Sequence, residues 1–264
     1  MHEERNKSTV YGPVKSWRFG MSLGIDPIFQ TSICSFNCVY CQLGQIQKIT
    51  AKRDEYVSTQ RVISDFKDNL AKNEKVDVIT FSGSGEPTLA TNFGEMVREI
   101  KKLSPTTPIF ILSNGTLLGD PDVIKDLLLF DKVTVKLDAC NEEDFQTINR
   151  PTKELSFDKV WENMVKFRSV YNGNFEVQIM LMPNMGKLII DDLAKRLKSL
   201  RPDLIQINTP KRPYPLSWHR ENRGNHDEVF DYKVSQLKTM SKEEALAIVE
   251  QLKNLTGLEF QIFS

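Results

Sequence analysis

Apolar runs of strand length alternate along this chain with amphipathic stretches of helix length. Runs rich in β-branched and aromatic residues predict strands at residues 22–29, 76–81, 108–112, 132–138, 175–182 and 204–208. The stretches between them have helical periodicity and predict helices at residues 59–72, 93–103, 121–130, 157–171 and 187–200. This alternation is typical of repeated βα units around a parallel sheet.

Six such units with right-handed crossovers predict an α/β fold, a partial (β/α)6 barrel, because a closed barrel of this kind has eight units. After residue 210 the pattern changes to an irregular polar and aromatic stretch, followed by a helix over residues 241–255 and an edge strand over 258–263. Ser241 and Glu244 form a capping-box pattern at the start of that helix. We therefore expect an N-terminal segment (1–21), a barrel (22–210) and a C-terminal extension packed on the barrel (211–264).

Composition narrows the class of protein. A chain of 264 residues with 40% hydrophobic and 27% charged residues is ordinary for a globular protein with a substantial core. The formal net charge is zero, so the molecule as a whole has no long-range field that attracts nucleic acid or an anionic membrane. The charged start and the lack of a long apolar run predict a cytoplasmic protein without a membrane segment.

Three of the four cysteines, Cys34, Cys38 and Cys41, have the spacing C-x3-C-x2-C in a segment with almost no charge. Closely spaced thiolates on a loop converge on a metal centre. Three thiolates suit a four-iron cluster with one iron left open, whereas a structural zinc site needs a fourth protein ligand. The alternatives are a disulfide with a spare thiol, or a zinc site closed by a distant residue.

Polar side chains follow each of the predicted strands, and in α/β barrels the functional residues gather at the carboxyl ends of the strands. After the cysteine loop, the candidates from successive strand ends are Gly83, Ser84, Gly85 and Glu86; Ser113 and Asn114; Lys136 and Asp138; Gln178 and Met180; and Asn208.

These candidates have different predicted roles. The glycines of Gly83 to Glu86 allow bare backbone to approach a ligand, and the carboxylate accepts hydrogen bonds from an ammonium group; the same run is also a common tight turn. Lys136 and Asp138 share one face of their strand, either as a structural ion pair or as an anchor for a charged ligand. Gln178, Met180 and Met182 are candidates for the cavity wall, although for the two methionines core packing is the favoured interpretation.

With its C-x3-C-x2-C loop and Tyr40 beside Cys41, the sequence resembles the radical S-adenosylmethionine (radical SAM) superfamily. The resemblance covers residues 24–210. It implies that the three cysteines hold a [4Fe-4S] cluster whose open iron is chelated by S-adenosylmethionine. It also implies that the Gly83 to Glu86 run binds the ammonium group, that Ser113 and Asn114 face the ribose, and that Asn208 lies on the adenine side. Ser84 departs from the family's Gly-Gly-Glu pattern.

The segment from Tyr11 to Pro27, together with Cys38 to Gly44, resembles short radical SAM proteins related to the wyosine-forming tRNA enzymes. Those enzymes carry a second cluster on upstream cysteines, and here no cysteine precedes Cys34. The resemblance thus implies a single-cluster enzyme that does not carry out the pyruvate-dependent wyosine reaction.

The chemistry implied by the resemblance is reductive cleavage of S-adenosylmethionine to a 5′-deoxyadenosyl radical, which abstracts hydrogen from a substrate. The reaction needs an electron donor such as ferredoxin or flavodoxin. The substrate, whether a small molecule, a protein or a tRNA, is not specified by the sequence, and we expect a monomer. The alternatives are an iron–sulfur electron-transfer or sensing protein and a noncatalytic zinc module.

Two further features of the sequence each have two interpretations. Cys140 is interpreted as a buried inert thiol, with a hydrogen-donor role near the cavity as the alternative. The segment from Trp218 to Arg223, with Lys211 and Arg212 upstream, mixes cations and aromatic rings in a way that suits either RNA contact or a solvated loop.

Overall fold

The computed structural model describes residues 8–72, 75–183, 187–210, 214–224 and 232–262. Its strands are β1 (Val10–Ser16), β2 (Gly20–Ile25), β3 (Ile33–Cys34), β4 (Lys48–Ile49), β5 (Val78–Phe81), β6 (Ile109–Ser113), β7 (Lys132–Lys136), β8 (Asn174–Met180), β9 (Leu204–Asn208), β10 (Tyr214–Pro215), β11 (Val234–Ser235) and β12 (Phe260–Ile262). Its α-helices are α2 (Thr59–Leu70), α3 (Phe93–Leu103), α4 (Pro121–Leu127), α5 (Glu142–Asp144), α6 (Phe157–Val170), α7 (Lys187–Leu200) and α8 (Lys242–Thr256).

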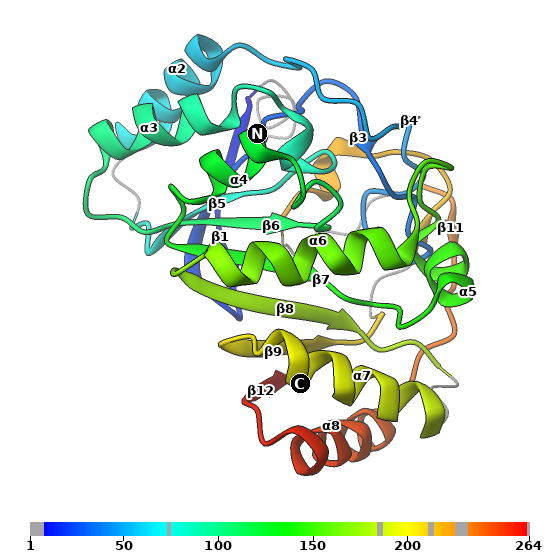
Figure 1. Cartoon of the computed structure of the whole chain (residues 1–264). Helices are drawn as coiled ribbons and strands as arrows, with labels where there is room; N and C mark the ends of the chain where they lie inside the picture. The colour runs from blue at the N-terminus through cyan, green and yellow to red at the C-terminus, as the bar shows by residue number, and fades with distance from the viewer. Residues whose placement is uncertain (1–7, 73–74, 184–186, 211–213, 225–231, 263–264) are drawn as a thin grey trace.

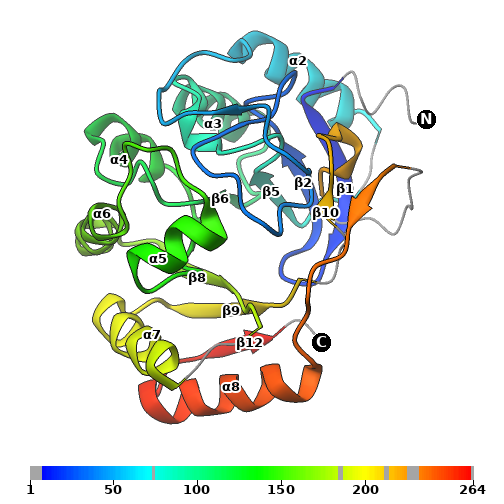
Figure 2. The ribbon, with the colours of Figure 1, turned by 90° about the vertical axis from the view of Figure 1, so that its right-hand side faces the viewer.

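The main sheet has the order β1-β2-β5-β6-β7-β8-β9-β12. The strands from β2 to β12 are parallel to their neighbours, and β1 pairs antiparallel with β2. Figure 2 shows the sheet curled inside an arc of helices, with α2, α3, α4, α6, α7 and α8 on the outside. The predicted partial barrel is confirmed, with its six βα strands at β2, β5, β6, β7, β8 and β9.

The helices begin where the sequence places their caps. Ser58 accepts a hydrogen bond from the amide of Arg61 at the start of α2. Ser241 and Glu244 form the predicted capping box at the start of α8. Each cap satisfies amides of the first turn that have no partner within the helix.

Two terminal strands extend the barrel. The predicted edge strand is confirmed as β12, which pairs with β9 (Figure 1). At the other edge β1 was not predicted, because Gly12 and Pro13 interrupt the strand pattern and the pairing register shifts between Tyr11 and Val14. The division of the chain at residues 21 and 210 stays a prediction, and strands from all three segments belong to this one sheet.

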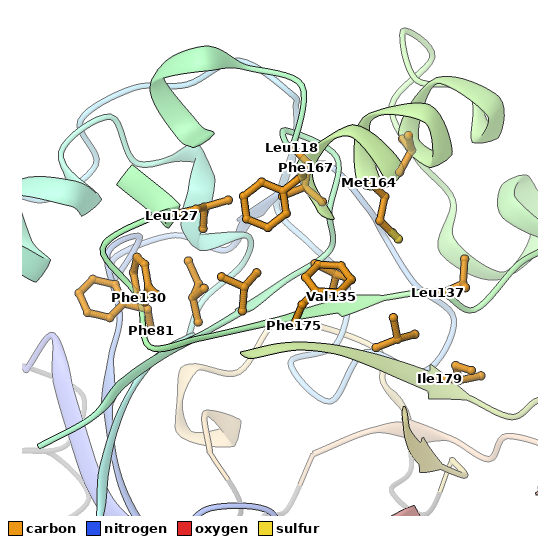
Figure 3. Close-up of a cluster of buried hydrophobic side chains, with 14 of the residues drawn as sticks. Phe81, Leu118, Leu127, Phe130, Val135, Leu137, Met164, Phe167, Phe175 and Ile179 are labelled. Atoms are coloured by element: carbon orange, nitrogen blue, oxygen red, sulfur yellow. The ribbon is translucent and has the colours of Figure 1, made fainter. Parts of the chain in front are cut away.

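Alternating side chains on the strands separate the hydrophobic core from the barrel interior. In β8, Val177 and Ile179 are buried in the core, whereas Gln178 and Met180 line a cavity inside the barrel. Figure 3 shows Val135, Phe175 and Ile179 on the strands facing Met164 and Phe167 of α6. The core therefore lies between the sheet and its helices, which leaves the inner face of the sheet free for polar groups.

None of the helices in the described part of the chain combines the length and hydropathy of a membrane-spanning segment.

Candidate functional site

The cysteine loop leaves β3 at the carboxyl end of the barrel, and its three thiols are free. Nitrogen donors point at two of the sulfurs. The amide of Phe36 and the side-chain Nδ2 of Asn114 lie 3.4 and 3.5 Å from Cys34 Sγ. The Nδ2 of Asn149 lies 3.6 Å from Cys38 Sγ. N–H donors to sulfur are characteristic of cysteines that ligate iron–sulfur clusters.

The electrostatic environment of these thiols also fits ligation of an iron–sulfur cluster. Burial raises the pKa of Cys38 to about 12 and that of Cys41 to about 11. Burial, together with the nearby Glu86 carboxylate, raises the pKa of Cys34 well above its ordinary value. A thiolate here is stable only with a compensating positive charge, and iron ions supply that charge in a cluster. The donor set and its surroundings therefore fit a [4Fe-4S] cluster.

Among the described residues, no three His, Cys, Asp or Glu side chains converge on the position of a single ion. A cluster makes no such demand, because each of its cysteines ligates a different iron.

The Gly83 to Glu86 run follows β5 and lies against the cysteine loop. The amide of Glu86 donates to the carbonyl of Ile33 at 3.0 Å, and the amide of Ile33 donates to the carbonyl of Ser84 at 3.0 Å. Gly85 has a φ of 153°, and a Cβ at this position would lie 1.7 Å from the Ile33 carbonyl oxygen. A residue without a side chain is therefore required where the two loops touch.

Glu86 ties together the loops that follow β5 and β6. Its Oε1 accepts hydrogen bonds from the hydroxyls of Thr88 (2.6 Å) and Ser113 (2.8 Å), and its Oε2 accepts one from the amide of Asn114 (2.6 Å). The side chain is 2% exposed, and burial raises its pKa although these hydrogen bonds oppose the rise. Glu86 and Ser113 are thus engaged within the protein, and their expected contacts with ammonium and ribose groups stay predictions.

Asp138 is a second buried hub. Its Oδ1 lies 3.0 Å from Lys136 Nζ and accepts a hydrogen bond from the amide of Met180 at 2.8 Å. Its Oδ2 accepts hydrogen bonds from the Tyr40 hydroxyl and, at 3.0 Å, from Asn149 Nδ2. The predicted Lys136 and Asp138 pair is therefore present, and it connects β7 and β8 to the cysteine loop.

A cavity of about 300 Å³ occupies the barrel interior. Four of the predicted site residues lie on its wall: Cys41, Gly83, Lys136 and Asn208. Gln178 lines it as expected, and Met180 lines it although the sequence favours core packing for this residue, whereas Met182 is not on this wall. Ser84 instead donates a hydrogen bond to Asp26 at 2.6 Å, and Asn114 donates to the Ser35 hydroxyl at 2.8 Å.

Some residues of the candidate site belong to no motif that is recognisable in the sequence. Asn149 reaches both Cys38 and Asp138 from a short π-helical turn (Phe145–Asn149), far along the chain from the cysteines. Its neighbour Arg150 is exposed. Tyr11 of β1 lines the cavity, and its hydroxyl lies 2.7 Å from that of Ser82.

Cys140 lies in the hydrophobic core and is 4% exposed, away from the cavity wall. Burial raises its pKa to about 12. The expected burial of this thiol is therefore confirmed, and its inertness stays a prediction.

The segment from Trp218 to Arg223 packs back onto the barrel. Arg223 forms a buried ion pair with Asp26 at 2.9 Å, and Arg220 lies over the ring of Phe29 at 4.9 Å. Arg223 therefore fits neither of the two interpretations of this segment, RNA contact or a solvated loop, because it is buried and its charge is paired inside the protein. Lys211 and Arg212 lie outside the described residues.

Known proteins are similar to this chain in sequence and in fold. The model of the Radical SAM superfamily matches residues 28–208, more than half of the chain. A UPF0026 protein of Synechocystis sp. is 39% identical over 251 residues, covering 94% of each chain. Archaeal TYW1 shares the fold with a TM-score of 0.55 at 14% identity, over 89% of this chain and 72% of its own.

The structure of anSMEcpe with bound AdoMet has a TM-score of 0.60 at 21% identity, over 91% of this chain and 63% of its own. At these identities the solved structures show the fold alone, and the family is shown by the sequence matches. The predicted enzyme class is confirmed, and the cofactors of the family are a [4Fe-4S] cluster and S-adenosylmethionine. This chain belongs to the Radical SAM superfamily.

Proposed function

We propose that this chain holds one [4Fe-4S] cluster on Cys34, Cys38 and Cys41, cleaves S-adenosylmethionine reductively, and abstracts hydrogen from a small molecule. One observation carries the proposal. The sequence predicts site residues at the ends of different strands, and four of them lie on the wall of one cavity: Cys41, Gly83, Lys136 and Asn208. The cavity of about 300 Å³ is of a size that takes metabolites.

When bound, the two cofactors supply one-electron cleavage of a sulfonium and a carbon radical able to abstract hydrogen. The protein has the tasks of binding, orienting and excluding water. Asn114 and Asn149 donate to the sulfurs of Cys34 and Cys38 and so favour the thiolate form. Gly85 lets the ligand loop lie directly against the cysteine loop.

The hubs of Glu86 and Asp138 keep these loops in place without the ligand. Each carboxylate accepts hydrogen bonds from two or more neighbouring segments, so that the cavity wall is formed in advance. We assign the ammonium group to the Gly83 to Glu86 run, the ribose to the Ser113 and Asn114 loop, and the adenine to the side of Asn208. A small electron donor such as ferredoxin or flavodoxin completes the proposal.

The test is anaerobic reconstitution with iron and sulfide, followed by dithionite and S-adenosylmethionine, with 5′-deoxyadenosine measured by mass spectrometry. We expect about four irons per chain and 5′-deoxyadenosine above the level without protein. Cys34→Ala, Cys38→Ala and Cys41→Ala should each lose the cluster, and the matched control Cys140→Ser should keep it.

A wild-type protein that binds the cluster but yields no 5′-deoxyadenosine, even with cell extract as a source of substrate, would contradict the cleavage. An electron-transfer or sensing role would then account for the cluster. Stoichiometric zinc with no iron uptake would contradict the cluster itself.

A further inference from the structure

The turn between β1 and β2, formed by Trp17, Arg18 and Phe19, has no place in the function described so far. It precedes Gly20, the first residue of β2, so it lies at the amino end of the parallel strands. The cysteine loop follows the opposite, carboxyl end. All three turn residues nevertheless line the same cavity as Cys41. The cavity therefore extends along the barrel from the cysteine loop to this turn.

Arg18 is the charged residue of the turn. Its guanidinium carbon lies 5.5 Å from the ring centroid of Trp17 and 5.2 Å from that of Phe19. Its Nε is buried and has no hydrogen-bond partner among the described residues. Burial lowers the pKa of Arg18 to about 10, which is still well above neutral pH, so the side chain stays a cation.

The neighbouring charges inside the barrel already have partners. Lys132 pairs with Glu176, whose Oε2 also accepts a hydrogen bond of 2.5 Å from Gln206. Lys136 pairs with Asp138 at the other end of β7. Arg18 forms no such ion pair with any residue in the described ranges. The nearby Glu176 carboxylate raises the pKa of Arg18, but it is already paired with Lys132, so Arg18 has no ion-pair partner of its own at the amino end of the barrel. A cation without an ion-pair partner in a confined site favours an anionic ligand.

Two amides add hydrogen-bonding capacity farther along the barrel, at the level of Lys136, which is the register partner of Gln178. The Nε2 of Gln178 and the Oε1 of Gln206 are buried without partners among the described residues. They are register partners on β8 and β9, and Gln178 lines the cavity. Buried donors and acceptors are normally satisfied, so the unpaired donor of Gln178, on the wall of the same cavity as Arg18, indicates a polar ligand.

We propose that Arg18 binds an anionic group, a carboxylate or a phosphate, of the small molecule that enters the barrel. Its guanidinium is suited to grip either group through two parallel hydrogen bonds. The anion would sit at the amino end of the cavity, and the part of the molecule that reacts would extend toward the cysteine loop. This assignment rests on the proposed function only in naming the bound molecule as the substrate.

The experiment measures anion binding directly, by isothermal titration calorimetry on the cluster-reconstituted protein without S-adenosylmethionine or reductant. The two probes are inorganic phosphate and succinate, which separate the two possible groups. The variants are Arg18→Gln and Arg18→Lys. The control is Arg98→Gln, because Arg98 lies on the surface and is paired with Asp126.

At least one probe should bind saturably to the wild-type protein. Arg18→Gln should weaken that binding about 10-fold or more, since charge-assisted hydrogen bonds are lost. Arg18→Lys should weaken it less, and Arg98→Gln should leave it unchanged. The proposal is overturned if neither probe binds the wild-type protein, or if Arg18→Gln binds as tightly as wild type.

A second measurement decides the matter if Arg18→Gln does not fold. Phenylglyoxal modifies accessible arginines, and peptide mass spectrometry reports the modification at each position. The binding probe should slow modification of Arg18 in the wild-type protein and leave that of Arg98 unchanged; equal modification of Arg18 with and without the probe overturns the proposal. Both readouts are independent of cofactor cleavage, so failure here and failure to form 5′-deoxyadenosine are distinguishable results.

Discussion

Arg223 Nη1 lies 2.9 Å from Asp26 Oδ2, and the two side chains are 3% and 0% exposed. The pair joins the C-terminal part of the chain to the end of β2, next to the Gly83 to Glu86 run, because Asp26 also accepts a hydrogen bond from Ser84. A segment that sequence patterns suggest as a binding surface is thus part of the framework that holds the ligand loops.

Arg223→Ala should therefore destabilise the fold. Removing one partner of a buried ion pair leaves an uncompensated charge and costs about 3–5 kcal/mol. Chemical denaturation of the variant checks this value. Arg98→Ala is the control, since its exposed pair with Asp126 is worth at most about 1 kcal/mol. Equal losses in the two variants would contradict the structural role of Arg223.

Asn149→Leu should lower the reduction potential of the cluster. The N–H donor to Cys38 Sγ places positive charge near the sulfur and so stabilises the reduced, more negative cluster. A redox titration followed by electron paramagnetic resonance measures the shift. Asn69→Ala is the control and should leave the reduction potential unchanged, because the Asn69 side chain only donates a hydrogen bond to a backbone carbonyl within α2. A potential unchanged in Asn149→Leu would show that this contact does not reach the cluster.

Gly85→Ala should impair cluster incorporation. The added Cβ would collide with the carbonyl of Ile33, and the backbone of both loops would have to move. Iron content after reconstitution should fall several-fold. Gly257→Ala is the matched control, because Gly257 also has a positive φ but its Cβ would meet no atom within 4 Å. That control should cost about 1–2 kcal/mol of stability and retain its iron.

The buried phenol of Tyr11 should make the free energy of unfolding fall at alkaline pH. Burial raises the pKa of Tyr11 from 10.0 to about 12. The unfolded chain therefore loses this proton at lower pH than the folded chain does, and unfolding is favoured as pH rises. The contribution is fully present below pH 10.0, and about 2–3 kcal/mol is lost as pH rises to about 12.

Tyr11→Phe should remove this part of the pH dependence. Unfolding free energies at pH 9 and pH 11, together with tyrosinate absorbance, provide the measurement. Tyr11→Phe should eliminate one late-ionising phenol from the titration. If the variant instead lacks a phenol that ionises near pH 10.0, Tyr11 ionises like an exposed tyrosine and the prediction is wrong.

Much of the fold could be predicted from local patterns. The parallel strands and their helices follow from the alternation of apolar runs and amphipathic stretches, and several helix starts follow from capping residues. β1 could not be predicted in this way, since Pro13 has no amide to donate and is tolerated only because the strand lies at an edge.

The site was predictable where its residues follow strand ends. The cysteine loop, Gly83, Lys136 and Asn208 obey that rule and converge on the barrel. Asn149 and Arg223 do not, because tertiary packing alone brings them to Cys38 and Asp26. Arg18 could not be predicted from strand ends either, because it reaches the cavity from the turn before the amino end of β2.

The division of β8 and β9 into an outer apolar face and a largely polar inner face has an evolutionary consequence. Replacing Gln178 changes the wall of the cavity without opening a void in the core formed by Val177, Ile179 and Ile207. Stability and ligand choice are thus inherited at alternate positions of the same strands. An exchange at an inner position such as Gln178 therefore alters the cavity while the core of the scaffold stays intact.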